Sequence, residues 1–352
     1  MIGKAQGPPI SITGLGAYVP SRIVTNDELS TMVDTNNEWI MERTGIRERR
    51  IAAPDEAFTD LALPAAKAAL EQAELDAADL DLLLCATVTP DMMFPTSSAL
   101  LADTLGAGDA AAYDLLAGCT GFMYALVQAY GMMAAGLADR ALVVGGDVLS
   151  RILDWTDRST VVLFGDGAGA VVLEKVDKPG FLGFELGADG GGGIHLSLPG
   201  SGSRRIEDAS ANGFIHMNGR EVFKFATRVL VSSAEAVLER CGVSVEDVDL
   251  YVPHQANVRI MDHAAAKLGI PRERMVVNVD RYGNTSSGSI PLALAEAQAG
   301  GRLKEGDLVL MTGMGAGLTW GSALMEWTGG SPVASLSAFP ARDRWRSGWA
   351  VR

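Results

Sequence analysis

The chain has 352 residues, of which 48% are hydrophobic and 20% charged, a composition typical of a soluble globular protein large enough for two core units. Its formal net charge of −14 at pH 7 argues against general nucleic-acid binding, which needs a basic surface. Three cysteines without paired spacing predict a reducing, cytoplasmic compartment without a disulfide framework, and the lack of an apolar stretch of membrane-spanning length predicts no membrane contact.

Hydrophobic spacing predicts that helices alternate with buried strands along the chain. In chain order, we expect a helix over residues 58–74, strands over 79–88, 140–148 and 160–176, a helix over 221–240 and a strand over 307–313. Because these strands are mostly continuous apolar runs, they belong in the centre of a sheet. The predicted fold class is therefore α/β.

The chain also repeats itself in sequence. The stretch LEQAELDAADLDLLL from Leu70 aligns without a gap with LERCGVSVEDVDLYV from Leu238, and five positions are identical. Next come AGCTG in the first copy and YGNTS in the second, and each copy closes on VVLFGDGAGAVVLE or VLMTGMGAGLTWGSALME, interpreted as a strand, a glycine turn and a strand. We expect duplicated halves over 1–178 and 179–328, followed by a loosely ordered extension over 329–352.

Two glycine-rich segments need a separate interpretation. GDGAGA at residues 165–170 leads into a predicted strand, whereas a dinucleotide-binding loop leads into a helix. The longer segment over 186–205 is predicted to be a surface loop early in the second half. Since the four histidines also lack zinc-ligand spacing, we expect no permanently bound cofactor and no metal.

Cys119 lies between glycines in AGCTGF, at the start of a predicted helix. A helix N-terminus offers free N–H groups and a positive dipole end that stabilise a thiolate, so we expect a lowered pKa and a reactive thiol. The alternative is a small buried apolar residue. Cys85, inside a predicted strand, and Cys241, at the end of an amphipathic helix, are expected to be structural.

Two polar residues occupy positions that match Cys119. His254, in VPHQANVRI, follows a buried strand, and Asn284, in YGNTS, stands in the second half where Cys119 stands in the first. Hydrogen-bonded packing for His254 and a turn or N-cap role for Asn284 are the alternatives. Strand ends gather reactive groups in α/β proteins, so the three residues together indicate a catalytic set.

The segments AGCTGF, VPHQANVRI, YGNTSSGSIPLAL and GAGLTWGSAL together resemble the β-ketoacyl-acyl carrier protein synthase III family of the thiolase fold. The resemblance runs from about residue 10 to residue 328. It implies a homodimer with a five-layered α/β/α/β/α fold made of duplicated halves. It also implies decarboxylative Claisen condensation of an acyl-CoA primer with malonyl-acyl carrier protein, which gives a 3-oxoacyl carrier protein and initiates fatty acid or polyketide synthesis.

The resemblance assigns catalytic roles within this set. Cys119 would be the nucleophile that takes the acyl group, and His254 and Asn284 would stabilise the enolate left by decarboxylation. The backbone N–H groups of Cys119 and Ala316 would hold the oxyanion. The chain departs from the family at Gly118 and Thr120, where alanines are common, and at Ala316, where glycine is usual.

We expect the backbone N–H groups of Cys119 and Ala316 to donate hydrogen bonds despite these three changes, and we expect Thr120 to narrow or polarise the site.

The resemblance also implies binding positions. The predicted coenzyme A and pantetheine contacts are Trp39, Arg43, Thr44, Arg158, Gly219, Phe223, Ala256 and Asn257. The predicted docking surface for the acidic carrier protein comprises Lys224, Arg259 and Lys267.

The primer pocket is predicted at Met92, Met93 and Phe94. The resemblance implies that Phe94 reaches across the dimer interface into the partner's pocket. Interface packing alone is the alternative for the two methionines. An apolar pocket of limited depth would suit short or branched acyl groups of about two to six carbons.

Three other functions are alternatives to a condensing enzyme. An acyltransferase of the same fold would load Cys119 and pass the acyl group to a hydroxyl or amine without decarboxylation. A degradative thiolase is disfavoured, because the closing loop GMGAGLTWG has no second cysteine. A non-catalytic acyl- or coenzyme A-binding protein with a redox-sensitive thiol would need neither His254 nor Asn284.

Overall fold

Two β-sheets with the same strand order form the centre of the computed structural model, which describes residues 3–204 and 213–329. The first sheet has the order β1 (Ile10–Tyr18), β7 (Gly167–Lys175), β6 (Arg140–Asp147), β4 (Leu82–Ala86) and β5 (Ala111–Leu115). The second has the order β8 (Phe181–Ala188), β13 (Thr319–Glu326), β12 (Leu308–Gly315) and β11 (Leu250–Pro253).

The strand directions also agree between the sheets. The pairs β4–β6 and β11–β12 are parallel, and the pairs that follow them outward are antiparallel. A single parallel bridge from Tyr251 to Met275 stands where β5 pairs with β4 in the first sheet. The predicted boundary after residue 178 falls between β7 and β8, and the division into two halves at that point stays a prediction.

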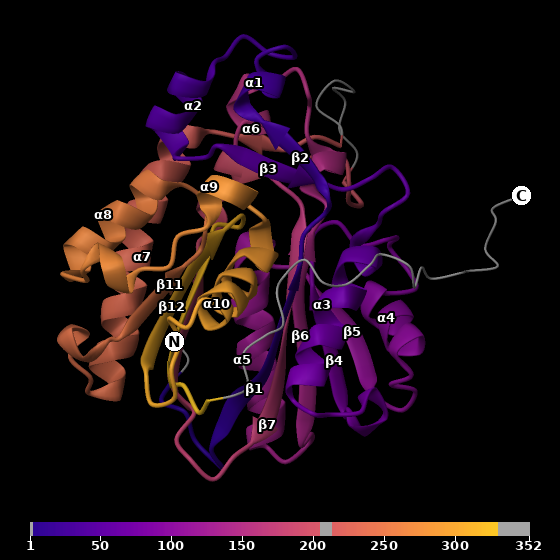
Figure 1. Ribbon diagram of the computed structural model, residues 1–352, viewed down its shortest axis with the longest axis vertical. Helices are drawn as coiled ribbons and strands as arrows, with labels where there is room; N and C mark the ends of the chain where they lie inside the picture. Colours follow the sequence, from indigo (N-terminus) through magenta and orange to yellow (C-terminus); the bar gives the residue numbers. More distant parts are fainter. Residues whose placement is uncertain (1–2, 205–212, 330–352) are drawn as a thin grey trace, which may run out of the picture.

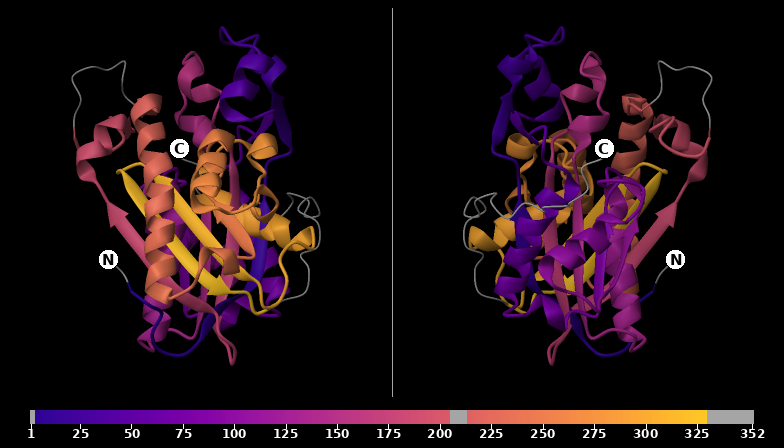
Figure 2. Two further views of the ribbon diagram at one scale, coloured as in Figure 1. Left: turned by 90° about the vertical axis from the view of Figure 1, so that its left-hand side faces the viewer. Right: turned by 90° about the vertical axis from the view of Figure 1, so that its right-hand side faces the viewer.

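Helices separate and cover the two sheets, so that five layers alternate (Figure 1). The outer helices on the first sheet are α3 (Phe58–Gln72) and α4 (Ser97–Leu105). The helices between the sheets are α5 (Gly121–Ala134) and α10 (Ser289–Ala299). The second sheet is covered by α7 (Gly219–Cys241), which lies along its outer face in Figure 2, and by α8 (Val258–Leu268). This is the predicted α/β/α/β/α arrangement.

The composition of the helices explains which layer each one occupies. In α5, nine of 14 residues are buried, and in α10 nine of 11 are buried, so both helices are enclosed by core on nearly all sides. In α7, nine buried residues of 23 follow one stripe, and the opposite face carries charged residues. The two central helices therefore start at positions that the core holds firmly.

Smaller elements cap the edge of the sheets at which α5 and α10 begin (Figure 1). These are β2 (Arg22–Thr25), α1 (Asn26–Leu29), α2 (Asn37–Thr44), β3 (Glu48–Ile51), α6 (Arg158–Val161), β9 (Leu196–Ser197), β10 (His216–Met217) and α9 (Val279–Tyr282). Among residues 3–204 and 213–329, no helix is both long and apolar enough to cross a bilayer.

Two predicted segments have a different structure. The strand expected over 160–176 begins only at Gly167, because Thr160 and Val161 end α6 and Phe164 instead bridges to Asn284. The predicted strand, glycine turn and strand of the first half is therefore wrong. Its apolar residues are buried in side-chain clusters rather than in a sheet: Val161 and Val162 pack with residues of both halves, and Phe164 packs with Leu149 and Leu153.

The glycine-rich segment over 186–205 is not wholly a surface loop either. It begins in β8, forms a 3-10 helix over Gly190–His195 and continues into β9. Apart from Gly329, the extension predicted over 329–352 lies outside the described residues, as does Arg205.

Helix α3 lies so close to β1 that only glycine fits on the strand beneath it. A Cβ on Gly16 would lie 2.0 Å from the carbonyl oxygen of Ala65, and a Cβ on Gly14 would lie 2.0 Å from that of Ala69. The alanines of α3 and the glycines of β1 thus bring helix and strand backbones together without a side chain between them. This contact fixes the outer layer of the first half.

We predict that Gly16→Ala lowers the free energy of unfolding by about 1–3 kcal/mol or more, because the helix must move away from the strand. The matched control is Gly131→Ala, within α5, where an added Cβ meets nothing within 4 Å. That change should raise the free energy of unfolding by roughly 0.5–1 kcal/mol. Urea unfolding measures both, and a Gly16→Ala protein as stable as wild type would contradict the close contact.

Candidate active site

Three chain segments bring the predicted catalytic residues to one edge of the sheets. Cys119 lies in the 3-10 turn Gly118–Thr120 that leads into α5, and Asn284 precedes the 3-10 turn Ser286–Gly288 that leads into α10. His254 directly follows β11. All three line one cavity, so the structure brings together the residues that the sequence pattern selected.

The turn between β12 and β13 packs directly on the backbone of the nucleophile. A Cβ on Gly315 would lie 2.6 Å from the Cys119 nitrogen, and a Cβ on Gly118 would lie 2.9 Å from the Ala316 nitrogen. Gly118 also has a φ of +58°, a left-handed conformation that favours glycine. The two backbone nitrogens predicted to hold the oxyanion therefore belong to segments in direct contact.

Thr120 has a structural role that differs from the expectation. Its hydroxyl donates to the carbonyl oxygen of Ala117 at 3.0 Å and pairs with the hydroxyl of Thr319. The side chain is fully buried, and it lines neither of the cavities that Cys119 lines. The prediction that Thr120 narrows or polarises the site is therefore wrong, since its hydroxyl joins the 3-10 turn to β13 instead.

Asn284 is held by its own backbone and by the next turn. Its N–H donates to the Leu163 carbonyl at 2.8 Å, and its carbonyl accepts from the Gly165 N–H at 3.0 Å. The side-chain Oδ1 accepts from the N–H of Ser286 at 2.8 Å. This bond turns the amide NH2 group away from the turn, and the Asn284 side chain lowers the pKa of the Cys119 thiol.

His254 is a buried, neutral side chain with one free nitrogen. Its backbone N–H donates to the Thr312 carbonyl at 2.7 Å, and its Nδ1 lies 2.6 Å from the Ser289 hydroxyl. That hydroxyl also accepts from the N–H of Gln255, and when it donates its own proton to Nδ1, the ring proton lies on Nε2. Among the described residues, Nε2 has no partner, and burial lowers the pKa of His254 to about 4.

The pKa of Cys119 moves opposite to the prediction. Burial, with a smaller contribution from the charge of Asp147, raises it to about 11, although side-chain hydrogen bonds from Ser286 and Asn284 oppose the rise. The expected lowering by a helix N-terminus is therefore wrong for the free protein. Cys85 is fully buried in β4 with a raised pKa, which agrees with a structural role, and Cys241 ends α7, where its structural role stays a prediction.

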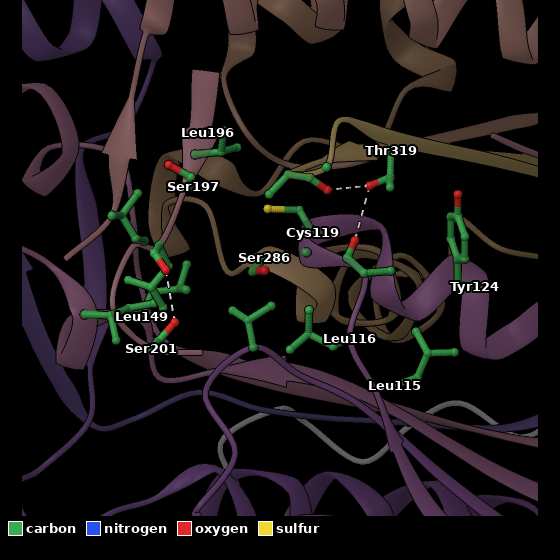
Figure 3. A pocket seen from close by; sticks show the side chains of 18 of the residues that line it. Leu115, Leu116, Cys119, Tyr124, Leu149, Leu196, Ser197, Ser201, Ser286 and Thr319 are labelled. Carbon is green, nitrogen blue, oxygen red and sulfur yellow. Dashed lines mark hydrogen bonds between the residues drawn. The ribbon is translucent and has the colours of Figure 1, made fainter. Parts of the chain in front are cut away.

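Cys119 lies where two cavities meet. The larger one, of about 540 Å³, is mostly apolar and reaches to Leu149, Leu116 and Tyr124 (Figure 3). The smaller one, of about 130 Å³, holds His254 and Asn284. It is also lined by four of the predicted pantetheine contacts, Gly219, Phe223, Ala256 and Asn257. One arm is thus suited to an apolar group on the sulfur and the other to the approaching thioester.

The predicted nucleotide contacts gather at the outer end of α2. The guanidinium of Arg43 lies 4.7 Å and that of Arg158 lies 5.0 Å from the centre of the Trp39 ring. Asn257 joins this group to the smaller cavity, because its side chain donates to the Arg43 carbonyl at 3.0 Å. Thr44 is buried and its hydroxyl donates to the Ile40 carbonyl, so the structure does not bring that side chain to the same surface.

The predicted docking and primer residues are at the surface. Lys224, Arg259 and Lys267 are exposed on α7 and α8, and the Arg259 guanidinium lies 5.6 Å above the Phe223 ring. The exposed fractions are 41% for Met92, 77% for Met93 and 84% for Phe94. Within one chain, these three side chains do not line the larger cavity.

Asp147 is a buried residue near the site that the sequence pattern did not select. It ends β6, accepts from the N–H of Val88 at 2.7 Å and from the Thr87 hydroxyl at 2.8 Å, and lies 3.2 Å from the Ser287 hydroxyl. Burial raises the pKa of its carboxyl group. A carboxylate that directly follows a continuous apolar strand was the available signal, because such a charge needs buried partners.

The loop over 196–201 was predicted to be a surface loop and not a part of the site. Its Leu196, Ser197 and Ser201 line the larger cavity. No local pattern indicated that a polar, glycine-rich loop folds over the nucleophile. In the described part of the chain, no cluster of histidine, cysteine and acidic side chains is arranged to hold a metal ion.

The matching family models and the curated relatives carry one family name. Residues 113–190 match the family model of 3-oxoacyl-(acyl-carrier-protein) synthase III, and residues 238–327 match that of its C-terminal part. A β-ketoacyl-(acyl-carrier-protein) synthase III of Symbiobacterium thermophilum is 53% identical over 324 residues, which cover 91% of this chain and 98% of that protein.

Solved structures agree with the sequence matches. The synthase III of Thermus thermophilus has a TM-score of 0.86 at 50% identity, covering 91% of this chain and 99% of that one. The priming β-ketosynthase of the R1128 polyketide pathway has a TM-score of 0.87 at 39% identity, covering 92% and 98%. The predicted thiolase-like fold class is confirmed by these structures.

We predict that Cys119 of the free protein reacts slowly with iodoacetamide at neutral pH, and that the rate rises with pH toward a midpoint near 11. Ser286→Ala should move the midpoint higher, because the lost hydrogen bond favours the thiolate. Peptide mapping after brief pulses separates Cys119 from Cys85 and Cys241. A midpoint at or below about 8.5 would mean that the helix N-terminus outweighs burial.

Proposed function

This chain belongs to the 3-oxoacyl-(acyl-carrier-protein) synthase III family, and from that membership we propose that it condenses an acyl-CoA primer with malonyl-acyl carrier protein through an acyl group on Cys119. The chain is thus a condensing enzyme of the transferase class, and we assign it to the acyltransferases. The observation that carries the residue assignment is one cavity holding Cys119, His254 and Asn284.

The first half-reaction is acyl transfer to the sulfur. The Cys119 sulfur attacks the thioester carbonyl, and the oxyanion that forms is held by the N–H groups of Cys119 and Ala316. The carbon–sulfur bond to coenzyme A then breaks, and the thiol of coenzyme A leaves with the proton that Cys119 gives up. Because the pKa of Cys119 is about 11, the resting group is a thiol, and its proton ends on the departing sulfur of coenzyme A.

The second half-reaction forms the new carbon–carbon bond. The malonyl thioester loses carbon dioxide, and the enolate oxygen accepts hydrogen bonds from His254 Nε2 and the Asn284 amide. The α-carbon attacks the acyl carbonyl on Cys119, the bond to sulfur breaks, and the thiolate takes up a proton. With its pKa near 4, His254 stays neutral at pH 7 and does not protonate the carbanion.

The outer surface supports binding of both acyl carriers. We propose that the adenine end of coenzyme A stacks at Trp39 beside Arg43 and Arg158, where cations already lie on the aromatic ring. We propose that Lys224, Arg259 and Lys267 dock the acidic carrier protein. These three side chains place a local positive charge on the surface of a chain whose net charge is −14. Both carriers are intracellular metabolic partners, so we propose a cytoplasmic enzyme.

A homodimer would complete the primer pocket. The larger cavity reaches Leu116, whose exposed fraction is 76%, so a single chain leaves that apolar wall open to solvent. Phe94 and Met93 form a second exposed apolar group on a loop that follows Val88, itself part of the cavity wall. We propose that the partner's loop covers the opening, since large exposed apolar groups mark interaction sites.

We predict that His254→Ala and Asn284→Ala still form acyl-Cys119 from acyl-CoA but lose about 10²–10³ in condensation rate, the usual effect of removing an oxyanion donor. Mass spectrometry measures the acyl-enzyme, and release of carbon dioxide from malonyl-acyl carrier protein measures the second step. Cys119→Ala is the control and should form no acyl-enzyme. Transfer to a hydroxyl or amine without release of carbon dioxide would establish the acyltransferase alternative.

We predict that the enzyme prefers short acyl-CoAs and that Phe94→Ala or Met93→Ala extends the range to longer chains, because each removes apolar volume at the opening. A competition among acyl-CoAs for Cys119 measures the profile. Leu137→Ala is the matched control, since Leu137 is 71% exposed and follows the far end of α5. Unchanged profiles in both variants would leave interface packing as the role of this loop.

A further inference from the structure

The ring of His254 contacts one hydroxyl group at the start of helix α10. Its Nδ1 lies 2.6 Å from the hydroxyl oxygen of Ser289, the first residue of that helix. Both side chains are 1% exposed, so neither polar group turns to bulk solvent instead. Asn284 precedes the same helix start, which therefore contacts both side chains proposed to hold the enolate.

The backbone that carries His254 is held by the next side chain. The amide NH2 group of Gln255 donates to the carbonyl oxygen of Pro253 at 2.8 Å and to that of Val276 at 3.1 Å. With the backbone fixed on both sides of His254, the freedom that remains to the ring is rotation about its side-chain bonds. The contact with Ser289 restricts that rotation.

A count of donors and acceptors around the Ser289 hydroxyl decides which ring nitrogen carries the proton. Its oxygen accepts from the N–H of Gln255 at 3.4 Å, and the described residues give it one other partner, Nδ1 of His254. With a proton on Nδ1, two N–H groups would donate to this oxygen, and its own O–H would have no acceptor in a buried position. Such a group is unfavourable. With Nδ1 unprotonated, the O–H donates to it, and all of these groups are paired.

The other ring nitrogen faces the site. His254 lines the smaller cavity together with Cys119 and Asn284, and within the described chain its buried Nε2 has no partner. A protonated Nε2 is a donor for an enolate oxygen, whereas an unprotonated one would repel it. The Ser289 contact on one side of the ring thus determines whether the opposite side donates.

A hydroxyl at this position differs in its effect from a carboxylate. A carboxylate beside Nδ1 would orient the ring equally well, but its charge would favour a positively charged imidazolium. The Ser289 hydroxyl orients the ring without adding charge. It therefore supports the neutral donor that the second half-reaction needs.

We propose that Ser289 is a positioning residue that donates a hydrogen bond to Nδ1 of His254 and so holds the ring with its proton on Nε2, directed at the enolate oxygen. The catalytic consequence rests on the proposed function, because it requires a malonyl thioester in the smaller cavity. The hydrogen bond itself is a property of the free protein and is measured without substrate.

The first measurement is nitrogen-15 NMR of the full chain labelled in histidine, which distinguishes a protonated from an unprotonated ring nitrogen. The spectrum of His254→Ala identifies the His254 signals among those of the four histidines. In wild type, we expect Nε2 to be protonated and Nδ1 unprotonated. In Ser289→Ala, the Nδ1 signal should move further downfield, because an unprotonated nitrogen loses its hydrogen-bond donor, and Ser289→Thr should restore the wild-type position.

The second measurement separates the two half-reactions. We expect Ser289→Ala to lower the rate of carbon dioxide release from malonyl-acyl carrier protein about 10–100-fold, the usual effect of removing a partner that orients a functional histidine. Acylation of Cys119 by acetyl-CoA should stay at the wild-type rate, since that step does not use His254. Ser289→Thr retains the hydroxyl and should retain most of the rate of carbon dioxide release.

Ser322→Ala is the matched control for the loss of one buried hydroxyl. The Ser322 hydroxyl, on β13, donates to that of Ser233, on α7, at 2.8 Å, and Ser322 lines neither cavity at Cys119. This variant should keep both half-reactions at the wild-type rate and leave the His254 signals unchanged.

The outcomes separate this proposal from the function on which it rests. A wild-type protein that forms no acyl-Cys119 and releases no carbon dioxide would refute the proposed function, while its NMR spectrum would still test the hydrogen bond. A wild-type spectrum with the proton on Nδ1 overturns the proposal, whether or not Ser289→Ala folds. Equal losses in both half-reactions of Ser289→Ala, or an unchanged rate of carbon dioxide release, would also overturn it.

Discussion

The N-terminal ends of two buried helices meet at one edge of the sheets, and the whole site depends on that meeting. Helices α5 and α10 are enclosed between the sheets, so neither moves along its axis without opening the core. Cys119 precedes the first helix and Asn284 precedes the second. Packing of two apolar helices therefore positions Cys119, the proposed nucleophile, against Asn284, and His254 joins them because it directly follows β11.

The same enclosure sets the protonation of the reactive groups. Removal from water disfavours charge, so the pKa of Cys119 rises to about 11 and that of His254 falls to about 4. The resting site is a thiol beside two neutral donors. Under the proposed function, the neutral donors of His254 and Asn284 hydrogen-bond most strongly to the negative charge that develops on a bound thioester. Burial thus delays reactivity until the substrate is present.

The unusual residues around the nucleophile fit one another. Gly118 lacks a Cβ that would lie 3.1 Å from the Cβ of Ala316, so the smaller residue in one segment makes room for the larger residue in the other. Thr120 and Thr319 join the same two segments through their hydroxyl groups. These contacts hold together the two segments that carry the backbone N–H groups of Cys119 and Ala316.

Local pattern in the sequence determined the class of fold, and it predicted the repeat and the three candidate catalytic residues. Apolar runs and glycines mark where elements begin and end, and Cys119, His254 and Asn284 all stand at such ends. Tertiary structure alone decided the rest. It made residues 162–166 a connection rather than a strand, reversed the expected pKa shift of Cys119 and placed the Ser289 hydroxyl against Nδ1 of His254. The reason is physical, because pattern encodes whether a residue is buried, whereas desolvation, cavity walls and hydrogen-bond partners depend on distant segments packed against it.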